Sequence, residues 1–194
     1  MNVCLEILIN GARGGSLVSF PTDTVPALAT IPEKAELIYA AKQRSLDKPL
    51  ILMAARPEDL WTYVQGSEIE YQIWQEVVDK YWPGGLTLVL PASDKVPTVM
   101  NPVDPTTIGI RVPNNAIAQN ILAQTGPLAT TSANLSGQPP LETVAAIQTA
   151  FPGVITLEST TYQGLSVPST VAKWTGMDWQ ILRQGGIKLD NSGR

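Results

Sequence analysis

The segment LVSF at residues 17–20 and the segment PTDT at residues 21–24 that follows it decide the fold class. The first is a compact apolar run that ends at a proline, which is typical of a buried strand. The second is a polar turn with two hydroxyls and a carboxylate, and it either binds a small polar ligand or is an ordinary capped turn. Because ligands collect where strands end in open α/β sheets, the pair indicates an α/β protein with a site at its strand ends.

Outward from this point, apolar runs alternate with amphipathic segments along the whole chain. The patterns predict a short helix that starts at Leu5 and further helices over 33–43, 57–64, 69–81, 116–123 and 143–150. They predict strands over 50–53, 86–90, 107–112, 128–131, 154–157, 170–172 and 179–182, with an exposed loop over 93–104. We therefore expect a single α/β domain over 1–194, with a mixed sheet of about seven or eight strands and helices on its faces.

The amino-acid composition excludes several classes of protein and of catalytic site. Of 194 residues, 44% are hydrophobic and 15% charged, which argues against disorder. Thirteen basic and seventeen acidic residues leave a net charge of -4, so bulk charge does not favour nucleic-acid binding, although a local basic patch stays open. The absence of histidine excludes a serine or cysteine nucleophile paired with histidine, and any histidine metal site.

The single cysteine, Cys4, excludes an internal disulfide framework and a cysteine-rich metal site. A reducing cytoplasm is the simplest compartment. No apolar run has the length of a membrane helix, and residues 1–10 lack the basic flank of a secretory signal. We expect a soluble cytoplasmic protein without a membrane partner.

Four more polar segments end or follow predicted strands or helices. The segment at 42–50 holds three cations, which fit a polyphosphate clamp and equally a helix C-terminus that favours positive charge. Arg111 ends an apolar strand, where it either binds a carboxylate or solubilises an edge. The hydroxyl-rich loop at 129–137 favours a phosphate or small-substrate site. The segments 167–171 and 181–186 add hydroxyls and a strand-end arginine to such a site, or they form a plain hairpin. Residues 11–16 are glycine-rich but lack the lysine of a P-loop.

In this order, PTDTV, KQRSLDKPL, WPGGLTLVL, IGIRVP, TSANLSG, PSTV and ILRQG resemble the YrdC-like threonylcarbamoyl-adenylate synthases over residues 15–187. The resemblance implies a twisted mixed sheet around a concave, positively charged cavity. It implies that L-threonine, bicarbonate and ATP give threonylcarbamoyl-AMP and pyrophosphate, with Mg²⁺ accompanying ATP and no structural metal. The product serves N6-threonylcarbamoyladenosine (t6A) modification of tRNA, which implies other t6A-pathway proteins as partners.

The resemblance also implies the site residues. The threonine-binding set is Thr24, Arg111, Ser132 and Ser169. The ATP-binding set is Arg44, Lys48, Thr107, Asn134, Thr143 and Arg183, and the basic pair Lys42 and Arg44 is expected to act in catalysis, with Lys42 on phosphate. Carboxylation of threonine produces an anionic oxygen that needs no strong base, so a chain without histidine can carry out the transfer.

Two positions depart from the family pattern. Pro26–Ala27 replaces a Tyr-Gly-like pair, and Met53 stands where many members have a histidine. Two alternatives compete with the synthase. The first is a non-catalytic module that binds double-stranded RNA or tRNA through the same cavity. The second is a carbamoyl-adenylate chemistry fed by carbamoyl phosphate, which is less favoured because those relatives carry additional domains.

Overall fold

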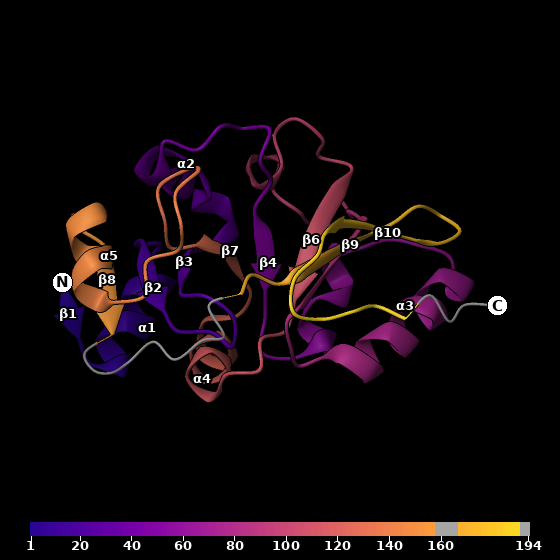
Figure 1. Ribbon diagram of the computed structural model, residues 1–194, viewed down its shortest axis with the longest axis horizontal. Helices are drawn as coiled ribbons and strands as arrows, with labels where there is room; N and C mark the ends of the chain where they lie inside the picture. Colours follow the sequence, from indigo (N-terminus) through magenta and orange to yellow (C-terminus); the bar gives the residue numbers. More distant parts are fainter. Residues whose placement is uncertain (158–166, 191–194) are drawn as a thin grey trace.

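The computed structural model describes residues 1–157 and 167–190, whose strands form one mixed sheet. In the described residues the sheet has ten strands in the order β1-β8-β2-β3-β7-β4-β6-β5-β9-β10 (Figure 1). The strands are β1 (Asn2–Val3), β2 (Val18–Phe20), β3 (Ala27–Thr30), β4 (Ile51–Met53), β5 (Leu86–Pro91), β6 (Thr107–Arg111), β7 (Leu128–Ser132), β8 (Ile155–Leu157), β9 (Thr170–Trp174) and β10 (Trp179–Arg183).

Five α-helices and four short 3₁₀ turns connect the described strands. The helices are α1 (Leu5–Arg13), α2 (Glu36–Lys42), α3 (Glu68–Tyr81), α4 (Ala116–Thr125) and α5 (Val144–Ala150). The 3₁₀ turns are η1 (Pro32–Lys34), η2 (Pro57–Asp59), η3 (Trp61–Tyr63) and η4 (Thr98–Met100). Side chains set three of the helix starts, because Ser67, Asn115 and Thr143 accept hydrogen bonds from the otherwise unpaired N–H groups of α3, α4 and α5.

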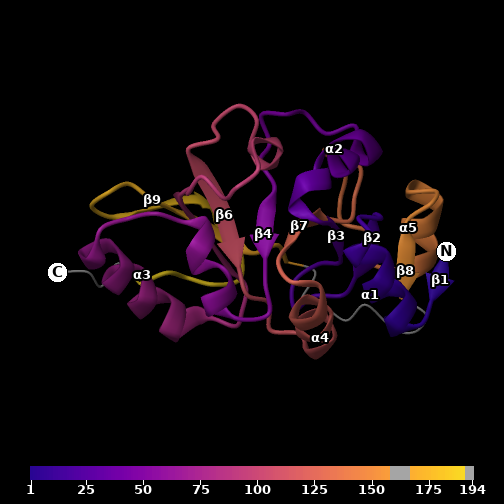
Figure 2. The same ribbon diagram turned by 180° about the vertical axis from the view of Figure 1, so that it is seen from behind.

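The helices cover both sides of the sheet (Figures 1 and 2). In Figure 1, α1 and α4 lie together below the part of the sheet formed by β2, β3 and β7, while α2 lies above it. The apolar faces of α1 and α4 meet Phe20 and Leu128 in one buried cluster. A second cluster contains Ile38 of α2 and Trp74 of α3 and follows β5 and β9 to the other end. Both faces are thus buried, which explains why the central strands are apolar almost throughout.

The expected mixed α/β sheet is confirmed, and so are most of its elements. The pairs β4–β6 and β5–β9 are parallel, whereas β9–β10 is antiparallel, as the short connection predicts. The strands β1 and β3 were not predicted, because β1 has only two residues and β3 is a run of small and apolar side chains without alternation. The segment 57–64 forms two 3₁₀ turns instead of a helix.

The prediction of an exposed loop over 93–104 is wrong in part. Met100 is fully buried in the core beneath the 3₁₀ turn η4, and Asn101 is also buried. Asn101 donates to the backbone and side-chain oxygens of Thr107, both at 3.2 Å. The loop is therefore tied to the start of β6.

Strand register brings distant polar segments to one place in the middle of the sheet. Ala27 of β3 pairs with Ser132 of β7, and Met53 of β4 pairs with Arg111 of β6. These positions are the strand ends to which the sequence assigns ligand-binding turns. In the described residues, no helix is both long and apolar enough to cross a bilayer.

Candidate active site

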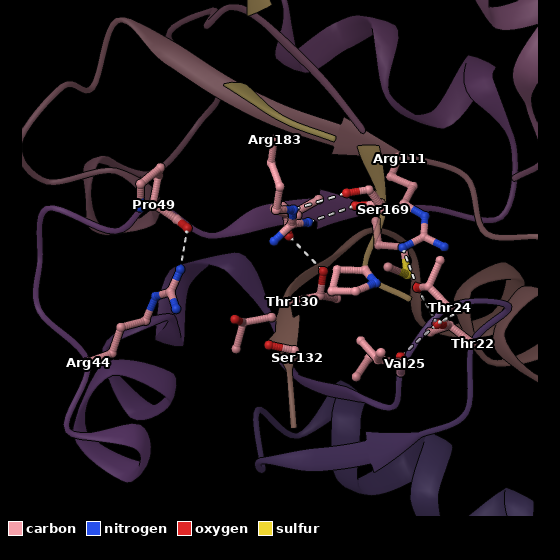
Figure 3. A pocket seen from close by; sticks show the side chains of 15 residues that line it. Thr22, Thr24, Val25, Arg44, Pro49, Arg111, Thr130, Ser132, Ser169 and Arg183 are labelled. Carbon is pink, nitrogen blue, oxygen red and sulfur yellow. Dashed lines mark hydrogen bonds between the residues drawn. The ribbon is translucent and has the colours of Figure 1, made fainter. Parts of the chain in front are cut away.

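A cavity of about 130 Å³ lies where β3, β4, β6 and β7 meet the turn before β9 (Figure 3). Its walls combine three arginines with many hydroxyls and a few apolar side chains. They are Thr22, Thr24, Val25, Ala27, Arg44, Pro49, Ile51, Met53, Arg111, Thr130, Thr131, Ser132, Pro168, Ser169 and Arg183. In Figure 3, Arg111 and Arg183 reach into the hollow from the same side, while Arg44 approaches from the far end.

Arg111 is the most constrained of the three arginines and is only 4% exposed. Its Nε donates to Gly84 O at 3.0 Å, its Nη1 to Thr24 Oγ1 at 2.9 Å and its Nη2 to Asp23 Oδ1 at 2.6 Å. Burial lowers the pKa of Arg111, and the Asp23 carboxylate acts in the opposite direction. A guanidinium has five N–H donors, so two remain after these bonds for a ligand in the cavity. This geometry suits a carboxylate ligand.

The turn after β2 presents Thr24 to Arg111 through its own hydrogen bonds. Thr22 Oγ1 donates to Val25 O at 2.7 Å and accepts from Thr24 N at 3.2 Å. The two threonine hydroxyls lie 3.1 Å apart. This local closure is the capped turn that the sequence allows, and it also places two hydroxyls on the cavity. The structural and the ligand-binding readings of PTDT are therefore compatible.

Ser169 and Arg183 form another part of the cavity wall. Arg183 Nε donates to Ser169 O and Arg183 Nη2 to Ser169 Oγ, each at 3.1 Å. Ser169 Oγ lies 2.9 Å from Thr87 Oγ1, which is fully buried in β5. Gly185 allows this arrangement, because a Cβ there would lie 2.2 Å from Pro168 O. The chain after β10 can thus pass directly over the turn that carries Ser169.

Arg44 leaves the end of α2 toward the cavity. Gln43 takes the left-handed conformation with φ 49° and ends the helix, so Lys42 and Arg44 emerge in different directions. Arg44 Nε donates to Lys48 O at 2.9 Å and Nη2 to Pro49 O at 3.0 Å. Desolvation lowers the pKa of Arg44, Tyr39 and Asp47 act in the opposite direction, and the charge of Arg183 lowers it. An anion between the two arginines would relieve this repulsion.

A second cavity of about 340 Å³ adjoins the first and shares Arg44, Pro49, Ile51 and Arg183 with it. Thr107 lines it, as do two unusually exposed apolar residues, Val103 (67% exposed) and Leu182 (52% exposed). Neither apolar residue was predicted, because an exposed valine or leucine has no sequence signature of its own. These apolar residues, in a cavity that also contains the two shared arginines, suit a flat ring next to a polyphosphate.

Lys42, Ser132 and Asn134 form a cluster behind the wall of the first cavity. Lys42 is 1% exposed, and its Nζ donates to Ser132 O, to Asn134 Oδ1 at 3.2 Å and to Thr131 Oγ1 at 3.5 Å. Asn134 in turn holds the loop by donating to Leu135 O at 2.9 Å. Neither Lys42 nor Asn134 is among the residues that line the two cavities described above.

Two other predicted nucleotide residues lie outside both cavities. Lys48 is exposed, and its backbone oxygen supports Arg44. Thr143 is exposed at the start of α5, where its Oγ1 accepts from Ala146 N at 3.2 Å. Thr143 therefore caps the start of α5. The nucleotide contact that the resemblance implies for Thr143 stays a prediction.

The site also contains residues that the predicted set lacks. Thr22 and Asp23 belong to the quoted PTDT turn, so their proximity was available from the sequence. Thr87 and Thr130 lie inside strands, where a single hydroxyl resembles any other strand residue. Met53 lines the first cavity and is 4% exposed, so its side chain forms part of the apolar wall.

The described residues contain no group of three His, Cys, Asp or Glu side chains placed to hold a metal ion. Asp23, beside the first cavity, is paired with Arg111. These residues do not fit a metal cage built by the protein alone. Mg²⁺ commonly binds through substrate phosphates and retained waters, and that mode needs few protein ligands.

Comparison with known proteins links the site to a family. The sequence model of the Sua5–YciO–YrdC family, described as telomere recombination, matches residues 11–185. A threonylcarbamoyl-AMP synthase of Vibrio campbellii is 35% identical over 192 residues, covering 93% of this chain and 98% of that protein. Pyrococcus abyssi Sua5 in complex with L-threonine has a TM-score of 0.81 at 33% identity, covering 94% of this chain and 54% of its own. Escherichia coli YciO has a TM-score of 0.82 at 25% identity, covering 96% and 91% of the two chains.

Proposed function

Because the chain belongs to the Sua5–YciO–YrdC family, we propose that it is an L-threonylcarbamoyladenylate synthase. In this reaction L-threonine, bicarbonate and ATP give threonylcarbamoyl-AMP and pyrophosphate, which makes the protein a nucleotidyltransferase. The observation that carries the proposal is Arg111, a buried guanidinium with two N–H donors left, on a cavity that Arg44 and Arg183 also line. An amino-acid carboxylate and a polyphosphate therefore have separate cationic partners a short way apart.

The amino acid is assigned to the end of the cavity near Arg111. Its carboxylate would take the two remaining N–H donors, and the hydroxyls of Thr24 and Ser169 would bind its polar groups. Ser132 lines the same cavity from β7 and completes the proposed threonine set. Met53 and Val25 give the apolar wall against which a small side chain can pack. The threonine-bound relative supports an amino-acid site in this fold.

ATP is assigned to the region that the two cavities share. Arg44 and Arg183 line both cavities, so a triphosphate between them lies close to the amino acid. The nucleoside would occupy the second cavity beside Thr107, with its base between Val103 and Leu182. Lys48 and Thr143 are exposed and line neither cavity, so we propose that they contact ATP only once it is bound.

The chemistry needs positioning and charge neutralisation more than a base. The threonine amine attacks the carbon of bicarbonate, water leaves, and an anionic carbamate results. One carbamate oxygen then attacks the α-phosphorus, the bond to the β-phosphate oxygen breaks, and pyrophosphate leaves. Arg44 and Arg183, which line the cavity, would neutralise the leaving pyrophosphate, and the buried Arg111 would hold the nucleophile in place. Mg²⁺ is proposed to enter with ATP on its phosphate oxygens, where it adds positive charge.

The proposal includes the biological setting expected from the sequence. The product would serve t6A formation on tRNA, with other proteins of that modification and tRNA as partners, in the cytoplasm. The first test is the release of pyrophosphate by the purified chain with ATP, Mg²⁺, L-threonine and bicarbonate. Release that requires all three substrates supports the proposal. If a relative of known activity turns over and this chain shows no threonine-dependent release, the proposal is wrong.

A further inference from the structure

Lys42 is a buried cation whose described contacts are all neutral. Its ammonium donates to Ser132 O, Asn134 Oδ1 and Thr131 Oγ1, and it is 1% exposed. The ion pairs found among residues 1–157 and 167–190 join Arg56 to Asp59, Lys80 to Asp190 and Arg111 to Asp23, and none involves Lys42. A buried lysine normally has a carboxylate partner. In the described part of the chain, the Lys42 ammonium has no carboxylate partner.

The charges that face Lys42 are of its own sign. Arg44 and Lys48 follow it in the chain, and both disfavour a further positive charge. The strand β7, which supplies its acceptors, and the strand β3, against which α2 packs, have no ionisable side chain. Glu36, at the start of α2, is exposed. Burial first, and these two cations next, lower the pKa of Lys42 to about 7.

The protonation state of Lys42 matters for the shape of the cavity. An ammonium has three N–H donors and can satisfy all three acceptors, whereas a neutral amine has only two. Ser132 links the two sides, because its backbone oxygen accepts from Lys42 while the residue lines the cavity. Proton loss therefore releases one of the bonds that hold the segment 131–134 against the site.

A polyphosphate at Arg44 and Arg183 would supply the missing negative charge. We propose that Lys42 is a positioning residue which takes up a proton when the nucleotide binds, and so fastens the segment 131–134 at the moment the cavity is filled. This inference rests on the proposed use of ATP. It differs from the sequence expectation that Lys42 touches phosphate, because its ammonium is already directed at three acceptors of the protein.

The size of the proton uptake follows from the two protonation equilibria. With a pKa of about 7 in the free protein, roughly a tenth of Lys42 is charged at pH 8. A nearby anion raises the pKa of a lysine by about one to three pH units, so between about half and nearly all of Lys42 is charged at pH 8 in the complex. The expected uptake at pH 8 is roughly 0.4 to 0.9 proton per nucleotide bound.

The test is isothermal titration of the full chain with MgATP at pH 8, without threonine, in buffers that differ in ionisation enthalpy. The dependence of the observed heat on the buffer gives the number of protons taken up. The wild type and Lys95→Met, which alters an exposed lysine that lines neither cavity, should show the same uptake. Lys42→Arg, a permanent cation, should bind MgATP with the uptake lost, and Lys42→Met should lose the uptake and bind more weakly.

The outcomes separate this inference from the function itself. If the wild type does not bind MgATP at all, the proposed function is wrong. If it binds with less than about 0.1 proton taken up, or if the uptake persists in Lys42→Arg, the inference about Lys42 is wrong and the function stands. Should Lys42→Met fail to fold, Lys42→Arg and the wild-type pH dependence still decide, because uptake at Lys42 requires the wild-type affinity to fall as pH rises from 7 to 9.

Discussion

Replacing Arg111 by methionine should remove threonine binding while ATP binding stays. The two N–H donors that Arg111 has left can make charge-assisted bonds to a carboxylate, each worth about 1.5–3 kcal/mol. A loss of about 3 kcal/mol corresponds to a rise of roughly 100-fold in the KM for threonine. The assay is pyrophosphate release at saturating ATP over a series of threonine concentrations, with the KM for ATP measured on the same variant at high threonine.

Arg111→Met also lowers the free energy of unfolding, and this effect must be measured separately from the loss of threonine binding. Arg111→Met leaves the Asp23 carboxylate, whose side chain is 15% exposed, without its partner at 2.6 Å. Breaking one side of a buried ion pair costs about 3–5 kcal/mol. Urea unfolding of the variant should show this loss. Arg111→Met should cost less in an Asp23→Asn background, because no carboxylate is then left unpaired.

Asp23→Asn is the matched control for the threonine site. Asparagine keeps an oxygen that can accept from Arg111 but has no charge to repel the carboxylate of the amino acid. We expect this variant to be less stable than the wild type, with a KM for threonine that does not rise. The assignment of Arg111 is refuted if folded Arg111→Met keeps a threonine KM within about threefold of the wild type.

Three further predictions follow from other parts of the structure. Val103→Ser and Leu182→Ser should each raise the KM for ATP about fivefold, which corresponds to about 1 kcal/mol of lost apolar contact, and leave the KM for threonine unchanged. The control Met177→Ser, at a residue that is 91% exposed, should change neither KM. Gly185→Ala should lower the free energy of unfolding by about 1–3 kcal/mol in a urea titration, because the new Cβ would meet a backbone oxygen at 2.2 Å; unchanged stability would show that this close approach is not required. The pKa of Lys42 in the folded protein is about 7, which is below its value in the unfolded chain, so folding releases a proton at pH values between the two. Lys42 therefore makes the free energy of unfolding rise with pH above 7, by at most about 1.4 kcal/mol per pH unit. Urea unfolding from pH 7 to 9 measures this slope, which should disappear in Lys42→Met.

Elements with a strong local pattern were predictable from the sequence. The helix α3 has apolar residues at helical spacing and begins directly after its N-cap Ser67, whose side chain and that of Glu70 cap each other's backbone N–H groups. The strand β5 is an apolar run bounded by prolines and glycines. By contrast, β3 is four residues of small and apolar side chains with no alternation. Its identity comes from pairing with β2 on one side and β7 on the other.

For the site, the sequence alone identified the polar turns and, through their order, the family and its reaction. Residue types and their spacing carry that information because each turn is local. Which atoms meet was decided by strand register and helix ends, which join residues about ninety positions apart, as in the bond from Lys42 to Ser132. In the sequence, Lys42 and Arg44 are two basic residues two positions apart, and nothing there distinguishes a buried ammonium from a guanidinium that lines a cavity. In the folded structure Gln43 ends α2 between them. Lys42 then donates to acceptors within the protein, and Arg44 lines the cavity.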